Sequence, residues 1–364
     1  MRSLKNKIVG KRIAWIIFLL FFAGTVSAKK ETEEMQEKEN LDVQELVFGH
    51  INDDYSWHIT TIGNTPVSIP LLVIVKSSER GWFVFCSSRF HHGHEAYEGF
   101  EISQSEENKG KVVELINGEE IRPLDISITK NVLSLLISCT LILVVFLSIA
   151  RQYKKNPLQR PTGLQAILEP LILTLDEDIA KACIGKNYKK FSPYILTAFF
   201  FIFINNVLGV IPIFPGGANL TGNISITLVL ATLTFLITNI FGTKEYWKEV
   251  FWPEVPTWLK VPVPLMPLIE IIGVFTKPIA LMIRLFANML AGHVMVLVLI
   301  GLIFVFSIIS PYVGASVSII SILLVVFMTL LEILVCFIQA YVFATLSALF
   351  IGLAQVEPHH QHSK

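Results

Sequence analysis

One apolar region, residues 276–331, constrains most strongly what this chain can fold into. Within it, the only side chains charged near neutral pH are Lys277, Arg284 and His293. A membrane-spanning helix needs only about 20 apolar residues, so the region predicts parts of two membrane helices. Arginine keeps its proton, and a guanidinium at the centre of a bilayer costs about 2.5–3.5 kcal/mol on insertion scales. We therefore interpret Arg284 as the functional centre. The alternative is an arginine near a helix end that extends to the headgroups.

The composition supports an integral membrane protein and argues against other classes. Of the 364 residues, 53% are hydrophobic and 16% charged, and 29 basic residues balance 29 acidic ones. Zero net charge argues against nucleic-acid binding. The sequence contains no GxxxxGK[ST] phosphate loop and no HExxH zinc motif, so we expect no cofactor and no catalytic activity in this chain by itself. The four cysteines lie far apart, which predicts no disulfide framework.

The N-terminal third predicts an exported region. Residues 1–28 combine basic residues, an apolar run of about a dozen residues and a small-residue cleavage site ending at Ala28, as in a signal peptide. An uncleaved anchor helix is the alternative, although the apolar run is short for a span. Residues 29–125 begin with a charged leader and continue with short β-like runs between Gly, Asn and Ser turns. They predict a small, partly β exported extension.

Histidines gather in this extension. Five of the nine lie there: His50, His58, His91, His92 and His94. The last three belong to the cluster FHHGHE, which suits a zinc or copper site. The other interpretation is a polar surface or interface loop that holds no metal, and this is the one we adopt.

The rest of the chain, residues 126–355, predicts an all-α polytopic membrane domain. We expect about five transmembrane helices and one surface amphipathic helix. The first span covers residues 126–150. Arg151, Lys154 and Lys155 follow it directly, and the positive-inside rule places them in the cytoplasm.

The later segments differ in their length and in their breaks. Residues 151–190 are half apolar and rich in basic residues, which predicts an amphipathic helix at the inner membrane face. Residues 191–243 carry no charge but contain Pro and Gly breaks, which predicts a helical hairpin. Residues 270–310 and 316–355 exceed a perpendicular span, so these two helices must tilt strongly. The tail, 356–364, is expected in the cytoplasm.

Polar residues on the first of these long helices form one side of the candidate site. At 100° per residue, Glu270, Lys277 and Arg284 fall within about 40° of one another. Asn288 lies one turn beyond Arg284 on nearly the same side. His293 is about 13.5 Å further along the axis than Arg284, on the opposite face.

The last helix adds Glu332 and Gln339, seven residues apart on one face. Because the two helices run in opposite directions, His293 is expected at the depth of Glu332, toward the outside, and Arg284 at the depth of Gln339. An imidazole and a carboxylate can pass protons, whereas an arginine that never deprotonates blocks them. The pattern therefore suggests two half-paths separated by Arg284, with Glu270 at the inner mouth. A structural salt bridge is the other interpretation.

These residues resemble subunit a of the F-type ATP synthase membrane sector. The resemblance covers residues 126–355. It is carried by TKPIALMIRLFANMLAGH at 276–293 and by the last-helix pattern from Glu332 to Tyr341. FINNVLGVIP at 203–212 and TGNISITLVLA at 221–231 carry it more weakly.

The resemblance implies a role for each polar residue. Arg284 is expected to face the rotating ring of c subunits, where it forces each ring carboxylate to release or exchange its proton. Asn288 and Gln339 match the polar neighbours of that arginine. Many bacterial members carry glutamate at the position of His293 and histidine at that of Glu332, so the pair is reversed here.

The resemblance also implies partners, location and function. Glu270 and Lys277 fall on family positions near the inner exit. The expected partners are the c-subunit ring, the peripheral stalk b subunits, other ATP synthase subunits and the lipid bilayer of a bacterial inner membrane, with a periplasmic N-terminal region and a cytoplasmic C-terminus. The chain is expected to be a non-catalytic stator subunit that couples proton flow to ATP synthesis. Proton and sodium ion are both open, and the exported extension exceeds the usual leader of the family.

Two other functions compete with this one. A secondary cation transporter would use Arg284 as a counter-charge, and it predicts internal repeats, of which the sequence shows none. A structural membrane scaffold with an exported metal-binding head predicts that Arg284 can be replaced without harm.

Overall fold

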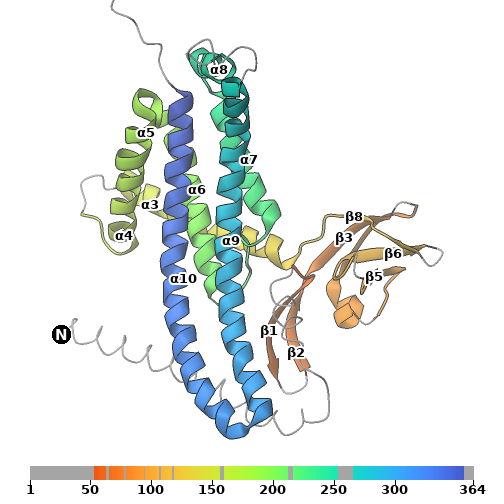
Figure 1. Ribbon diagram of the computed structural model, residues 1–364. Coiled ribbons are helices and arrows are strands. Elements are labelled where there is room, and N and C mark those ends of the chain that lie inside the picture. The colour runs from red at the N-terminus through yellow and green to blue at the C-terminus, as the bar shows by residue number, and fades with distance from the viewer. Residues whose placement is uncertain are drawn as a thin grey trace, which may run out of the picture. The chain divides into compact units, whose positions relative to one another are not determined.

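The computed structural model describes residues 53–62, 65–77, 79–93, 95–105, 108–116, 119–155, 160–211, 216–252 and 265–355. The predicted signal peptide, the charged leader, His50, His94 and the tail 356–364 lie outside the described residues. The described part is mostly helical, with a small β-rich region on its N-terminal side (Figure 1). This confirms the predicted fold class.

The β-rich region contains short antiparallel strands. They are β1 (Ser56–Ile62), β2 (Thr65–Pro70), β3 (Leu72–Ser77), β4 (Gly81–Cys86), β5 (Phe100–Ile102), β6 (Val112–Ile116), β7 (Glu119–Ile121) and β8 (Leu124–Asp125). They form a β1–β2 hairpin and two three-stranded sheets with the orders β4-β3-β8 and β5-β6-β7. A 3₁₀ helix, η2 (Ser87–Gly93), follows β4.

One face of the β4-β3-β8 sheet supplies the core of this region. Val73 and Val75 on β3 are completely buried and pack with Phe90 of η2 and Phe100 of β5. Side chains alternate between the two faces of a strand, so the residues next to these valines point the other way. Leu72 and Lys76 are indeed exposed. The sheet therefore has one packed and one open face.

The sheet continues up to the first long helix. The amide of Ile126 donates to the Ile74 carbonyl oxygen, and the amide of Ile128 donates to the Leu72 carbonyl oxygen, both at 2.9 Å. The predicted first span began at residue 126, but helix α3 (Lys130–Lys155) begins later because these amides are bonded to β3. Apolar composition alone does not distinguish the last residues of a buried strand from the first turn of a membrane helix.

Helices make up the rest of the described chain. They are α4 (Leu164–Leu173), the π-helix η3 (Thr174–Lys181), α5 (Ala182–Ile184), the 3₁₀ helix η4 (Gly185–Asn187), α6 (Tyr188–Val210), α7 (Ile224–Ile240), α8 (Lys244–Phe251), α9 (Leu265–Ile309) and α10 (Pro311–Ala354). Four stretches are long and apolar enough to cross a membrane: Lys130–Lys155, Leu164–Val210, Met266–Ile308 and Tyr312–Ala354. Helices α7 and α8, bent by 103°, make a fifth if they count as one span.

The segment from α4 to α5 is amphipathic, as the sequence predicted. Leu175, Ile179 and Ile184 are buried in a core shared with α6 and α10, while Glu177 and Asp178 are exposed. The apolar side of this segment thus packs on other helices of the chain. Its position at the inner membrane face stays a prediction.

The predicted hairpin of residues 191–243 is present as α6 and α7, joined by the Pro- and Gly-containing residues 211–223. The helical core lies where α6 meets α10. Phe199, Ile202 and Phe343 are buried there. The polar and charged residues of the site therefore lie on a framework held together by large apolar side chains.

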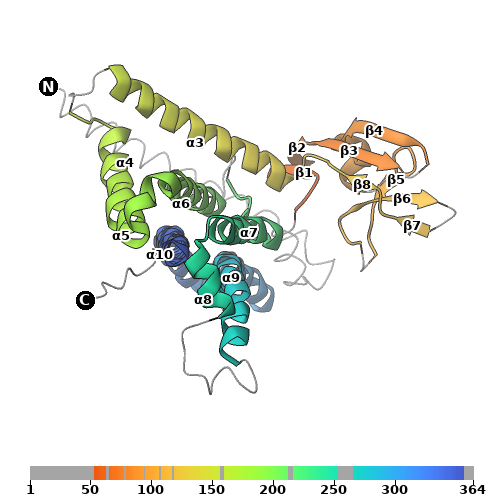
Figure 2. The same ribbon diagram turned by 90° about the horizontal axis from the view of Figure 1, so that it is seen from above.

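The last two helices are much longer than a bilayer is thick. Helix α9 has 45 residues and α10 has 44. At 1.5 Å per residue each is about 67 Å long, roughly twice the hydrocarbon thickness of about 30 Å. Figures 1 and 2 show α3 running across the direction of α9 and α10. If α3 follows the bilayer normal, the two long helices are strongly oblique, as their length requires.

Candidate functional site

Helices α9 and α10 pack against each other along the candidate site. The Asn288 side chain donates from Nδ2 to Gln339 Oε1 at 2.7 Å. Gln339 is buried on α10. The sequence placed Gln339 at the depth of Arg284, whereas the structure pairs it with Asn288, one helical turn further along α9. A hydrogen bond between two amides fixes the register of the two helices at this level.

Arg284 points away from the packed side of its helix. Leu281, Leu285 and Met289 are buried, whereas Arg284 and Asn288 lie on the exposed side of α9. Among the described residues, none forms a hydrogen bond or an ion pair with the Arg284 guanidinium. A permanent charge in an apolar helix is expected to have a partner. The open position of Arg284 makes it available to a group outside this chain.

His293 and Glu332 meet across α9 and α10. His293 Nδ1 lies 3.6 Å from Glu332 Oε1, and their side chains are only 16% and 7% exposed. This places an imidazole and a carboxylate side by side in a nearly buried position. Proton exchange between them requires only a small movement or one intervening water.

One glycine allows this approach, and the sequence reasoning did not identify it. A Cβ on Gly292 would lie 2.5 Å from Glu332 Oε1, so the carboxylate would have to move away. A Cβ on Gly209 of α6 would lie 3.5 Å from His293 Nε2, an ordinary contact distance, which shows that α6 lies beside the imidazole. Gly292 immediately precedes His293, so a glycine at this position is the feature of the sequence that could have indicated a close helix contact. That signal is readable only once α10 is placed against α9.

Within the described part of the chain, buried polar atoms without a partner occur at His293, at Glu332 and on the chain near Gly209. The buried atoms without a partner among the described residues include Asn205 Oδ1, Asn206 Nδ2, Asn219 Nδ2, His293 Nε2 and Glu332 Oε1. Asn205 and Asn206 lie one turn before Gly209 on α6. Buried polar groups are normally bonded, and where the protein provides no partner, water does. This end of α6 and α9 is thus suited to hold ordered water.

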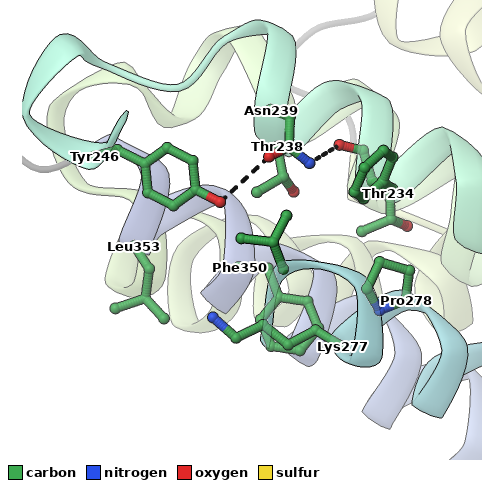
Figure 3. A pocket seen from close by; sticks show the side chains of 10 residues that line it. Thr234, Thr238, Asn239, Tyr246, Lys277, Pro278, Phe350 and Leu353 are labelled. Atoms are coloured by element: carbon green, nitrogen blue, oxygen red, sulfur yellow. Dashed lines mark hydrogen bonds between the residues drawn. The ribbon is translucent and has the colours of Figure 1, made fainter. Parts of the chain in front are cut away.

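A second polar region lies near the other end of α9. Lys277, Asn239 and Tyr246 line a small pocket of about 20 Å³ among α7, α8, α9 and α10 (Figure 3). The Tyr246 hydroxyl donates to Asn239 Oδ1 at 3.3 Å, and Lys277 Nζ lies 5.8 Å from the centroid of the Phe350 ring. Glu270, two turns before Lys277, is half-buried. The predicted inner residues therefore gather beside α7 and α8.

The histidine cluster of the N-terminal region yields no metal site in what the structure describes. No group of three His, Cys, Asp or Glu side chains gathers there among the described residues. His94 lies outside the described residues, and the side chains of His91 and His92 are not described. The choice between a metal site and a surface loop stays open.

Comparison with known proteins divides the chain at the start of α3. The ATP synthase A chain family matches residues 132–352, and a domain of unknown function, DUF8433, matches residues 46–129. The chain is similar to ATP synthase subunit a of Chlorobium phaeobacteroides, at 44% identity over 242 residues, 65% of this chain and 67% of the relative. The subunit a of Pelodictyon phaeoclathratiforme is 43% identical over 249 residues, 66% of this chain and 70% of the relative. That of Myxococcus xanthus is 39% identical over 255 residues, 67% and 80% of the two chains.

Proposed function

The chain belongs to the ATP synthase A chain family, and from this premise we propose that it conducts protons along two half-channels kept apart by Arg284. Membership of the family makes it a multi-pass membrane subunit of an ATP synthase, with a role in proton transport and ATP synthesis. The observation that carries the finer proposal is Arg284, a permanent charge on the exposed side of an apolar helix with no partner among the described residues.

The outer half-channel is assigned to His293 and Glu332. Their 3.6 Å separation, their low exposure and the unpaired asparagine atoms near them support a hydrated path at this end of α9. A proton that reaches this pair is then passed to a carboxylate of another subunit, which faces the exposed side of α9. Many bacterial family members carry a glutamate at the position of His293 and a histidine at the position of Glu332. The reversed order here still places one imidazole and one carboxylate at these two positions, which supports the same assignment.

The barrier is assigned to Arg284, with Asn288 and Gln339 as its polar neighbours. A mobile carboxylate on a ring of c subunits is the partner whose charge fits the open guanidinium. Their attraction draws the carboxylate in without its proton, and the fixed positive charge repels a proton that would cross directly. The Asn288–Gln339 hydrogen bond supports this role because it fixes α9 against α10 one turn away.

The inner half-channel is assigned to Glu270 and the region around Lys277. The polar pocket beside α7 and α8 supports this placement (Figure 3). The direction of the chain follows from Arg151, Lys154 and Lys155 in the last turns of α3, which favour a cytoplasmic end there and hence a cytoplasmic C-terminus. Peripheral stalk b subunits and the c-ring are the proposed partners, in a bacterial inner membrane. The chain itself is proposed to be non-catalytic.

The test is proton pumping and ATP synthesis in membrane vesicles that carry Arg284→Ala, beside wild type. Loss of both ATP-driven pumping and synthesis under an imposed pH gradient, with the complex still assembled, is the expected result. Ile283→Ala, a change at the exposed neighbour of Arg284, is the matched control and should keep both activities. Wild-type rates in Arg284→Ala would refute the barrier and leave the transporter and scaffold interpretations.

A further inference from the structure

We propose that the open face of the β4-β3-β8 sheet rests on the outer surface of the lipid bilayer. The face consists of Leu72, Trp82, Val84, Leu124 and Ile126, called here the docking face. The proposal concerns the exported region alone. It does not depend on the proton pathway.

The docking face is apolar and open. Its five side chains are 41%, 55%, 62%, 57% and 56% exposed, in the order given above. Strand alternation places them on the side opposite Val73 and Val75, which fill the core. Contiguous exposed apolar surface on a folded region marks an interaction site or a membrane contact.

The attachment of the sheet to α3 holds this face near the membrane. Ile126 and Ile128 are bonded to β3, and the amide of Lys130 donates to the Asp54 carbonyl oxygen at 2.9 Å. The amide of Asn131 donates to Asp53 Oδ1 at 3.0 Å. The connection is thus a bonded strand that passes into a capped helix, and Figure 2 shows β3 beside this end of α3.

The short connection limits how far the face can lie from the bilayer. Ile126 precedes the first residue of a candidate membrane span, Lys130, by four positions. Four residues extend at most about 14 Å. Residues 126 and 128 of this link are bonded to β3, and residues 130 and 131 are bonded to Asp54 and Asp53. The sheet therefore stays close to the level at which the chain enters the membrane.

The chemistry of the face fits the headgroup region. Tryptophan concentrates at membrane interfaces, and lysine extends its ammonium group toward phosphates while its stem stays on apolar surface. Lys76 Nζ lies 5.8 Å from the centroid of the Trp82 ring, so one cation and one aromatic ring form a unit on this face.

The face carries no acidic group along the described strands β3, β4 and β8. Asp125, the acidic residue of β8, accepts a hydrogen bond from the Tyr55 hydroxyl on the core side. Burial, together with this carboxylate, raises the pKa of Tyr55. A lipid surface presents phosphate groups above acyl chains, and an apolar face with one cation and no carboxylate fits both. The same face fits a basic protein surface less well, because it has no carboxylate to pair with the basic residues.

Depth-dependent fluorescence quenching on the assembled complex tests the proposal. Reporter cysteines are introduced one at a time, as Val84→Cys and Leu124→Cys, after replacement of Cys86, Cys139, Cys183 and Cys336 by alanine. Glu119→Cys on the exposed edge strand β7 is the control position. Each cysteine carries a bimane label, and the complex is placed in nanodiscs of phosphatidylethanolamine and phosphatidylglycerol. ATP synthesis by each variant reports that it is folded.

Lipids with a doxyl group near the headgroup are expected to quench bimane at Val84→Cys and Leu124→Cys at least threefold more than at Glu119→Cys. Iodide in the buffer should show the opposite order. Iodide quenching at all three positions alike would overturn the proposal, because the face would then be in solvent. Protection from both quenchers would also overturn it, since a protein partner would then cover the face.

Discussion

The β-rich region and the helical region each contain an arginine beside apolar side chains, and the two arginines differ in their polar partners. In the β-rich region, Arg80 donates from Nε and Nη2 to Glu114 Oε1 at 3.0 and 2.7 Å, and from Nη1 to the Glu98 carbonyl oxygen at 2.8 Å. Its guanidinium also lies over the ring of Phe100. Arg284 in the helical region has none of these contacts among the described residues. An arginine whose donors are satisfied locally supports the fold, whereas one left open is available to a partner.

The strongest test of this contrast makes the same substitution at both arginines. Arg284→Met should lower ATP-driven proton pumping at least about a hundredfold while leaving the thermal stability of the subunit unchanged or slightly raised, because a charge leaves the apolar helix. Arg80→Met should do the reverse. It should cost about 2–3 kcal/mol of unfolding free energy, since Glu114 stays buried without its cation. This is less than for a fully buried pair because the Arg80 side chain is 44% exposed.

The two readouts are proton pumping in vesicles and hydrogen exchange of β5 and β6 in the assembled complex. Arg80→Met with Glu114→Leu should recover part of the lost protection, because the unpaired carboxylate is then gone too. If Arg80→Met stopped pumping in a well-folded complex, the division between a structural and a functional arginine would be wrong.

A smaller effect is expected from adding one methyl group where α9 meets α10. Gly292→Ala would place its Cβ 2.5 Å from Glu332 Oε1 and displace the carboxylate from His293. We expect pumping to fall about tenfold, as for a misplaced proton-transfer group. Gly273→Ala on the same helix is the control, because its Cβ would meet nothing within 4 Å. Equal pumping in the two variants would show that the His293–Glu332 contact is not needed for transport.

The smallest expected effect concerns pH in the β-rich region. The hydroxyls of Ser105 and Ser103, with the amide of Asn108, lower the pKa of Glu120. Ionised Glu120 therefore stabilises this turn above its unfolded pKa of about 4.3, and the contribution is lost as pH falls through the folded pKa. Hydrogen exchange of residues 103–105, corrected for intrinsic rates, should lose protection in acid. Glu120→Gln should remove this pH dependence, and an unchanged dependence would assign it to another group.

The sequence predicted the membrane helices well because their signal is local. Arg284, His293 and Glu332 stood out as rare ionisable groups in apolar segments, and helical geometry was enough to place His293 near Glu332. The partner of Gln339 was misplaced by one turn, because the relative shift of two helices depends on packing at sites such as Gly292. The sequence of either helix alone does not determine that shift.

The contacts of the β-rich region could not be predicted in the same way. The Arg80–Glu114 pair joins residues 34 positions apart, and it exists only once β3 and β6 come together. The start of α3 was placed too early because Ile126 and Ile128 are as apolar as membrane residues. Nothing local shows that their amides are bonded to β3. Strand pairing depends on residues far apart in the sequence. The local pattern therefore predicted strands but not which strands pair with each other.

The oblique path of α9 changes what distance along the helix means. If a helix of about 67 Å stays within about 30 Å of hydrocarbon, each residue advances about 0.7 Å in depth but about 1.3 Å sideways. Arg284 and His293 are then separated by about 6 Å of depth and about 12 Å of lateral displacement. The two residues are therefore separated mainly within the plane of the membrane. Position along this helix thus describes mainly a lateral place in the membrane and only secondarily a depth.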